Sequence, residues 1–156
     1  MKVGRITCSD RAAAGVYEDK GGPEIERVFT ELWAAPVEFV PRMLPDEVGG
    51  IEAALRQLAD VAQCQLIITT GGTGISKRDV TPEATLAVLE KELPGFGEIM
   101  RTQTFAVAPT SILSRGTAGV RGHSLIINLP GNPKAIAQCL PPLMPAIREA
   151  LRHLAE

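Results

Sequence analysis

The chain has 156 residues, 45% hydrophobic and 22% charged, which are the proportions of one globular domain and exclude extended disorder as its main state. Its 16 Lys and Arg against 18 Asp and Glu leave a formal charge of -2, which argues against a nucleic-acid partner. No segment is apolar for long enough to cross a membrane and the first residues lack the apolar block of a signal peptide, so we expect a cytoplasmic protein.

The first part of the chain predicts two strands that alternate with two helices. Lys2 to Cys8 is short, rich in β-branched residues and apolar on both faces, as a central strand of a covered parallel sheet is. Gly22-Pro23 is expected to begin a helix, and a weaker strand at 36–40 is expected near an edge because prolines bound it. Apolar residues at three- and four-residue steps over 48–62 then predict a helix that Asp46 is placed to cap.

The middle of the chain predicts another strand and helix. Gln65 to Thr70 has the same two-sided apolar pattern as the first strand. Thr81-Pro82-Glu83 combines an N-cap residue, a proline and an acid in the first turn, so we expect a helix that ends at Pro94-Gly95. Residues 109–123 break the alternation and predict a short hairpin or an extended excursion.

The last part predicts a buried strand at Ser124 to Leu129 and a final helix. Asn132-Pro133 repeats the N-cap and first-turn proline signature, and Pro141-Pro142 is expected to interrupt the helix. Alternating strands and helices predict one α/β domain, a doubly wound and mostly parallel sheet with helices on both faces.

Polar or glycine-rich residues follow the carboxyl end of each predicted strand. These segments are Ser9-Asp10-Arg11, Pro45-Asp46-Glu47, Gly71-Gly72-Thr73-Gly74 and Pro130 to Lys134. The carboxyl ends of parallel strands share one edge, and ligands bind in the crevice there. We therefore expect the four loops to meet at one site.

The glycine loop Gly71-Gly72-Thr73-Gly74 lets backbone amides approach a ligand closely, which suits a phosphate. It is not a Walker A loop, because Ser76 stands where the second glycine is required. It is not the dinucleotide fingerprint either, because Lys77 replaces the third glycine, and this disfavours a dinucleotide-dependent oxidoreductase. A purely structural turn stays an open alternative.

Asp46 and Asp79 follow different predicted strands and are expected to face the same crevice. Carboxylates of this kind hold Mg²⁺, which completes its shell with water and substrate phosphates. Lys77, Arg78 and Lys134 lie beside the glycine-bearing loops and are suited to neutralise phosphate charge. Structural roles stay open for each: a helix cap for Asp46, a turn for Asp79 and a solvated surface position for the basic residues.

The cysteines and histidines suggest no catalytic group. Cys8, Cys64 and Cys139 are odd in number and scattered, which argues against a disulfide framework or a zinc site and favours buried thiols. His123 and His153 suggest no triad, and we expect both to be structural or exposed. A nucleophilic side chain is not required, because phosphoryl and nucleotidyl transfer can depend on positioning and charge stabilisation alone.

Two segments, Thr70 to Thr85 and Leu129 to Lys134, resemble the MogA/MoaB family of molybdenum-cofactor biosynthesis, which also includes the gephyrin G domain. Ser9-Asp10-Arg11, Gly15 to Gly21 and Pro94 to Glu98 resemble the family in the same order. The latter two favour its MogA-type branch, the molybdopterin adenylyltransferases.

The resemblance implies one molybdopterin-binding domain over residues 1–156. Its implied reaction joins the terminal phosphate of molybdopterin to the α-phosphorus of Mg-ATP and releases pyrophosphate. Asp46 and Asp79 match the essential acids, which we also expect to hold Mg²⁺. Gly71, Gly72, Thr73 and Gly74 match the nucleotide-phosphate loop, to which we add Ser9 and Asp10.

Molybdopterin itself is expected to contact Ser114, Asn132, Lys134 and Arg78. Because members of the family are commonly trimers, we expect a homotrimer, with the molybdate-inserting protein as the partner that takes the product. The alternative is a non-catalytic molybdopterin-binding or scaffold protein of the MoaB type.

Overall fold

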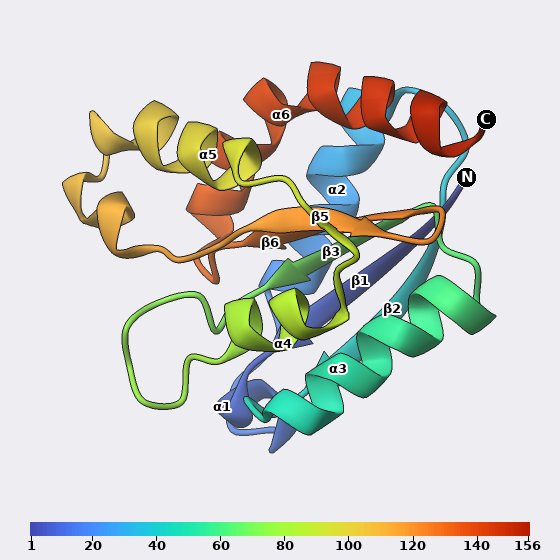
Figure 1. Ribbon diagram of the computed structural model, residues 1–156. Helices are drawn as coiled ribbons and strands as arrows, with labels where there is room; N and C mark the ends of the chain where they lie inside the picture. Colours follow the sequence, from blue (N-terminus) through green and yellow to red (C-terminus); the bar gives the residue numbers. More distant parts are fainter.

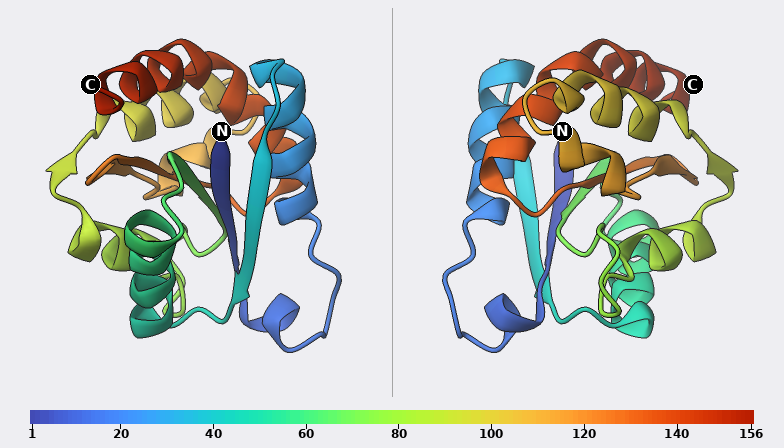
Figure 2. Two further views of the ribbon diagram at one scale, coloured as in Figure 1. Left: turned by 90° about the vertical axis from the view of Figure 1, so that its right-hand side faces the viewer. Right: turned by 90° about the vertical axis from the view of Figure 1, so that its left-hand side faces the viewer.

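The computed structural model describes residues 1–156 as three layers, with one sheet between two layers of helices (Figure 1, Figure 2). The strands are β1 (Lys2–Cys8), β2 (Glu38–Leu44), β3 (Leu66–Thr70), β4 (Lys91–Glu92), β5 (Ala118–Arg121) and β6 (Ser124–Leu129). The helices are α1 (Asp10–Ala13), α2 (Gly21–Trp33), α3 (Val48–Arg56), α4 (Thr81–Val88), α5 (Gly95–Phe105) and α6 (Pro133–Leu154). A π-helical segment, η1 (Gln57–Val61), extends α3, and a 3-10 helix, η2 (Pro109–Leu113), precedes β5.

The six strands are ordered β2-β1-β3-β6-β5-β4. β2, β1, β3 and β6 run parallel, β5 pairs antiparallel with β6, and β4 pairs antiparallel with β5. The predicted doubly wound, mostly parallel α/β fold is confirmed. The carboxyl ends of the four parallel strands form one edge of the sheet, called here the carboxyl edge.

Both faces of the central strands are buried, which explains their continuous apolar sequences. Leu66 and Leu125 pack in the larger core, beneath α2, α5 and α6. Ile67 and Ile126 pack in the smaller core, against α3 and α4. Successive residues of a strand point to opposite faces, so a strand covered on both sides has no polar face.

β2 confirms the prediction of an edge strand, although it begins at Glu38 and continues through Pro41 to Leu44. Pro41 pairs with Arg5 of β1. An edge strand tolerates a proline because one side of it needs no backbone donor.

The prediction of one helix from Thr81 to Pro94-Gly95 was wrong. α4 ends at Val88, β4 follows, and α5, which was not predicted, begins at Gly95. The amides of Glu90 and Leu93 donate to the carbonyls of Val120 and Ala118, both at 2.8 Å. This pairing with β5 is a tertiary interaction that overrides the local helical pattern.

The predicted interruption of the last helix at Pro141-Pro142 was also wrong, because α6 is continuous from Pro133 to Leu154. Leu140 and Leu143 are buried, while both prolines are exposed. Burial of the apolar face offsets the lost N–H bonds, and water can satisfy carbonyls left on the exposed face.

Several smaller predictions are confirmed. Residues 109–123 contain the first strand of the β5–β6 hairpin, preceded by η2. All three cysteines are buried and free, and His123 and His153 are exposed.

No helix is long and apolar enough to span a membrane. Both termini lie at the end of the sheet away from the 71–80 loop (Figure 1).

Candidate active site

The loops that follow β1, β2, β3 and β6 meet at the carboxyl edge. Ser9, Gly71 and Gly131, from three of these loops, line one pocket of about 130 Å³. The fourth loop is tied to the first by reciprocal bonds: the Asp10 amide donates to Asp46 Oδ2 at 3.0 Å, and the Asp46 amide donates to Asp10 Oδ1 at 2.9 Å. Residues distant in the sequence thus form one continuous surface.

The glycine loop presents unpaired backbone donors. The amides of Gly72, Thr73 and Gly74 donate to no acceptor within the protein. Successive free amides in such a turn favour an anion, because each contributes a partial positive charge. The structure therefore supports phosphate binding here better than a purely structural turn.

Gly72 is required by its conformation and by its neighbours. Its φ of 66° lies in the left-handed region that side chains disfavour. A Cβ at this position would overlap Thr81 Oγ1 and lie 3.0 Å from Asp46 Oδ1. Only glycine lets the loop pass this close to the Asp46 carboxylate.

Asp46 does not cap α3, contrary to the open structural alternative. The N-cap residue is Glu47, which makes no side-chain cap bond. Asp46 Oδ1 is buried without a hydrogen-bond partner. Burial raises the pKa of this carboxyl, and the nearby carboxylates of Asp10 and Asp79 raise it further, although the bond from the Asp10 amide opposes them. One oxygen of the Asp46 carboxylate is therefore bonded to the Asp10 amide, and the other is left without a partner.

Asp79 lies against the same glycine loop, beside Gly74. A Cβ on Gly74 would lie 2.8 Å from Asp79 Oδ2. This oxygen accepts from the Ser76 amide at 2.9 Å, and the Asp79 amide donates back to the Ser76 carbonyl at 2.9 Å. The turn predicted as the structural role of Asp79 is present, yet Oδ1 accepts no hydrogen bond and remains available.

The two acids fit a magnesium ion that arrives with a substrate. No group of three or more His, Cys, Asp or Glu side chains is arranged to hold a metal. In both Asp46 and Asp79, one carboxylate oxygen accepts a hydrogen bond from a backbone amide and the other has no hydrogen-bond partner. Mg²⁺ is usually bound by one or two carboxylates together with water and phosphate oxygens. The donor set thus suits an ion whose remaining ligands come from a triphosphate.

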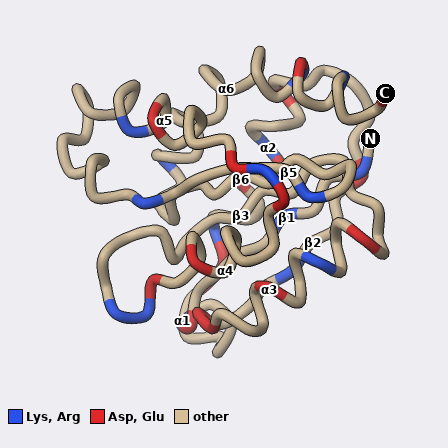
Figure 3. Tube along the Cα trace, in the orientation of Figure 1, with Lys and Arg blue, Asp and Glu red and all other residues tan.

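Arg78 forms a bidentate ion pair with Asp10 at the outside of the site. Its Nε and Nη2 lie 2.9 Å from Asp10 Oδ2 and Oδ1. The guanidinium holds the pKa of Asp10 below its usual range, so Asp10 stays ionised. Figure 3 shows basic residues at the tip of the 71–80 loop and acidic residues around α1. Arg78 lines neither pocket beside the glycine loop.

A second pocket, of about 270 Å³, lies on the other side of the glycine loop. Thr73, Gly74, Ser114 and Asn132 line it, and Asn132 also caps α6 by accepting from the Lys134 amide at 3.0 Å. The side chain of Lys134 lines neither pocket. The sequence analysis missed Arg101, which lines this pocket from α5, because it did not predict that helix.

The smaller pocket also contains residues that were not singled out. Tyr17 and Lys20 line it, and the only sequence signal for them was the Gly15–Gly21 segment of the resemblance. Cys8 lines it too, but burial raises the pKa of this thiol to about 12. At neutral pH it is therefore not a nucleophile.

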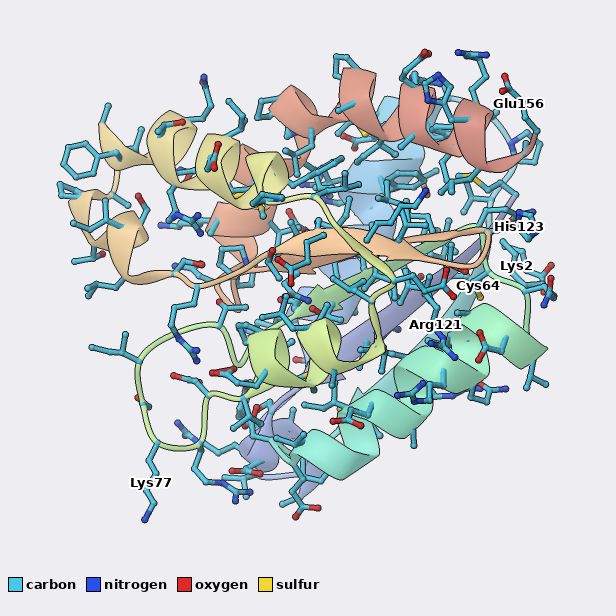
Figure 4. The ribbon with its side chains drawn as sticks, in the orientation of Figure 1. Lys2, Cys64, Lys77, Arg121, His123 and Glu156 are labelled. Atoms are coloured by element: carbon cyan, nitrogen blue, oxygen red, sulfur yellow. The ribbon has the colours of Figure 1, made fainter.

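A further pocket of about 310 Å³ lies at the opposite edge of the sheet, beside Cys64 and His123. Figure 4 shows these residues far from Lys77 in the 71–80 loop. The Ser124 hydroxyl there donates to the Cys64 carbonyl at 2.6 Å, and His123 Nδ1 lies 2.9 Å from the Leu154 carbonyl. These polar groups are therefore already hydrogen-bonded within the protein.

Comparison with known proteins gives one consistent result. A family model described as "Probable molybdopterin binding domain" matches residues 4–149. The chain is 50% identical over 147 residues to the molybdopterin adenylyltransferase of Helicobacter pylori, covering 94% of this chain and 84% of the relative. It is 49% identical over 140 residues to the Escherichia coli protein of the same name, covering 90% and 72%. The solved molybdopterin biosynthesis enzyme MoaB of Thermus thermophilus superposes with a TM-score of 0.89 at 41% identity, covering 98% and 95%.

Proposed function

This chain belongs to the family of probable molybdopterin-binding domains, and from this premise we propose that it is a molybdopterin adenylyltransferase of molybdenum-cofactor biosynthesis. Residues 1–156 then form one catalytic domain. The substrates are Mg-ATP and molybdopterin, and the products are adenylyl-molybdopterin and pyrophosphate. Relatives of this name at 49% and 50% identity support the proposal.

The observation that carries the proposal is the arrangement of charges around the glycine loop. Free amides of Gly72 to Gly74 lie between two carboxylates, each with an unpaired oxygen. An anion-binding loop alone would suit many phosphates. The added acids suit an anion that carries a divalent cation, as a nucleoside triphosphate does.

The reaction needs positioning rather than a protein nucleophile. An oxygen of the terminal phosphate of molybdopterin attacks the α-phosphorus of ATP, and the bond from that phosphorus to the pyrophosphate oxygen breaks. The amides of the glycine loop bind phosphate oxygens and favour the negative charge of the transition state. Asp46 and Asp79 would hold Mg²⁺, which when bound supplies positive charge to the triphosphate.

We assign the two pockets beside the loop to the two substrates. The 270 Å³ pocket, with Ser114 and Asn132, takes molybdopterin, and the side of the loop with Ser9 takes the nucleotide. We propose that Lys134, which lines neither pocket, contributes positive charge to the bound phosphates. Arg78 acts through Asp10 rather than by contact with molybdopterin, because its guanidinium is bonded there.

We also propose a homotrimer in the cytoplasm, where ATP is available. Several large apolar side chains of α5 and of the segment through η2 are exposed, which supports a subunit interface: Ile99, Phe105, Val107, Ile112 and Leu113. Adenylyl-molybdopterin is an activated intermediate, so a molybdate-inserting protein is the proposed next partner.

The test is to mix the purified protein with molybdopterin and Mg-ATP and to measure pyrophosphate and AMP-linked pterin. Asp46→Asn should abolish most product, whereas Asp60→Asn, which removes a carboxylate paired with Arg121 at the opposite edge, should not. Tight molybdopterin binding without pyrophosphate release would instead identify a non-catalytic binding protein. Release of neither product from active substrates would contradict the proposed enzyme.

A further inference from the structure

We propose that Arg115 is a positioning residue that fixes the glycine loop and Asp79 in the geometry needed for adenylyl transfer. This inference rests on the proposed function of the same site. Arg115 precedes β5 and is distant in sequence from the loop it contacts. Its guanidinium is bonded to carbonyls of the loop and to the Glu83 carboxylate, so it acts on the reaction through these residues.

Arg115 makes three hydrogen bonds to carbonyls of the 71–80 loop. Its backbone amide donates to the Thr73 carbonyl at 2.8 Å. Its Nε donates to the Gly74 carbonyl at 2.8 Å, and its Nη2 donates to the Asp79 carbonyl at 2.9 Å. One guanidinium thus joins the two ends of the loop tip and sets the distance between Gly74 and Asp79.

Little else holds this part of the loop. The segment 75–78 is exposed, and Lys77 extends away from the body of the protein (Figure 4). Apart from Arg115, the hydrogen bonds from segment 73–79 to the rest of the protein are those between Arg78 and Asp10. That pair is exposed on both sides, at 59% and 38%, so water competes with it.

Arg115 is itself held from two directions. Its Nη1 pairs with Glu83 in the first turn of α4. Nη1 of Arg101 donates to the carbonyls of Ser114 and Gly116, both at 3.2 Å, and so anchors the residues on either side of Arg115. The loop is therefore fastened to two helices, α4 and α5, through one side chain.

The chemistry of this contact requires arginine. A guanidinium is planar and carries donors in a fixed fork, so one side chain can bond two carbonyls and a carboxylate at the same time. A lysine ammonium at this position would keep the charge opposite Glu83 without fixing both carbonyls. Arg115→Lys thus separates the geometric role from the electrostatic one.

The first experiment compares Arg115→Lys with the matched control Arg121→Lys. Arg121 also bonds a carboxylate, that of Asp60, and a carbonyl, that of Val88, but at the opposite edge of the sheet. We expect Arg115→Lys to lower kcat about 10-fold at saturating Mg-ATP and molybdopterin, because small displacements of reacting groups cost rates of this size. Arg121→Lys should keep the wild-type kcat.

A second measurement does not depend on activity. Trypsin cleaves after Lys77 and Arg78, and Arg115→Lys leaves the number of cleavage sites unchanged. Cleavage in the loop should become several-fold faster, about 5-fold, because the ends of the loop open more often. The Arg121→Lys variant should be cleaved in the loop at the wild-type rate.

A third measurement places Arg115→Lys in the Asp79→Asn background. If Arg115 acts through Asp79, adding Arg115→Lys to Asp79→Asn should lower kcat by less than about 2-fold more, because the effects of coupled residues are not additive. A full additional loss of kcat in the double variant would overturn the role of Arg115 in positioning Asp79.

The two levels of inference fail in different ways. If the wild type releases no pyrophosphate, the proposed function fails, and loop cleavage still tests the contact of Arg115 with the loop. If the wild type is active and Arg115→Lys matches Arg121→Lys in kcat and cleavage, Arg115 is not a positioning residue and the proposed function stands.

Discussion

The two acids of the site are held in different ways. Asp46 lies in a short turn between β2 and α3, where the backbone amides of Asp46 and Asp10 each donate to the other residue's carboxylate and Asp46 buries an unpaired oxygen. Asp79 lies near the end of a long exposed loop, and its side chain bonds only Ser76 of the same loop. Asp46 is thus fixed by the first two loops of the sheet, whereas Asp79 depends on contacts made to its backbone.

This difference indicates that the site combines one fixed carboxylate with a second carboxylate on an adaptable loop. A carboxylate with one buried, unpaired oxygen costs stability, and such groups are retained where the charge is needed for function. Asp79 is half-buried and has no such buried, unpaired oxygen, so it carries less of this cost, and its exposed loop can adapt when a triphosphate arrives. We therefore expect Asp46 to set the charge of the site and Asp79 to complete it.

The largest expected effect is that of Asp46→Asn on turnover. Loss of a preorganised charge with one buried oxygen should lower kcat about 1,000-fold, and high Mg²⁺ should not restore it. Pyrophosphate release measured over a range of Mg²⁺ concentrations tests this. A variant that retains a tenth or more of the wild-type rate would remove the distinction between the two acids.

Asp79→Asn should have the second largest effect, about 100-fold on kcat. Because this side chain is half-buried and lies on a loop, raised Mg²⁺ should recover part of the rate. The same titration measures it. Equal, Mg²⁺-insensitive losses in both variants would show that the two acids act alike.

Gly72→Ala should affect both the loop and Asp46. A left-handed φ disfavours alanine by about 1–2 kcal/mol, and the added Cβ would press on Asp46 Oδ1, so kcat should fall about 30-fold. Gly49→Ala in α3 is the matched control, because a Cβ there meets nothing within 4 Å. Pyrophosphate release should fall only in Gly72→Ala, and the melting temperature should fall in Gly72→Ala but stay level or rise in Gly49→Ala, because alanine favours a helix.

Asp10→Ala tests the support of Asp46 rather than Asp46 itself. It removes the acceptor of the Asp46 amide and the partner of Arg78. We expect kcat to fall about 5-fold through looser positioning of both loops. Hydrogen exchange of the Asp46 amide should quicken in this variant, and unchanged exchange would indicate that the turn is fixed by other contacts.

The smallest expected effect concerns stability against pH. The pKa of Asp46 is raised in the folded protein, so the native state binds a proton more tightly than the unfolded state. The wild type should then lose stability, relative to Asp46→Asn, as pH rises from the ordinary carboxyl pKa through the raised one. Melting curves of both proteins should coincide below this window and separate above it, with Asn the more stable. A wild type that melts higher at neutral pH would contradict an unpaired Asp46 charge.

Local sequence patterns predicted most of the fold. Lys2 to Cys8 and Ser124 to Leu129 are strands with the predicted bounds, and Asn132 caps α6 as its sequence indicated. The boundary after Val88 was missed, because pairing with β5 determines it. The predicted interruption of α6 at its prolines was wrong because burial of the opposite, apolar face keeps the helix continuous.

Local patterns are enough to predict which residues are present at the carboxyl ends of the strands, since side-chain periodicity and turn chemistry act over a few residues. The sequence therefore indicated the glycine loop and the acids, and its motifs carried the family resemblance. Tertiary packing, by contrast, establishes that Asp46 is not a helix cap, that Arg78 binds Asp10 and that Arg115 holds Gly74 and Asp79. These contacts join residues from 36 to 68 positions apart, and such partners are selected by the packing of whole elements rather than by local pattern.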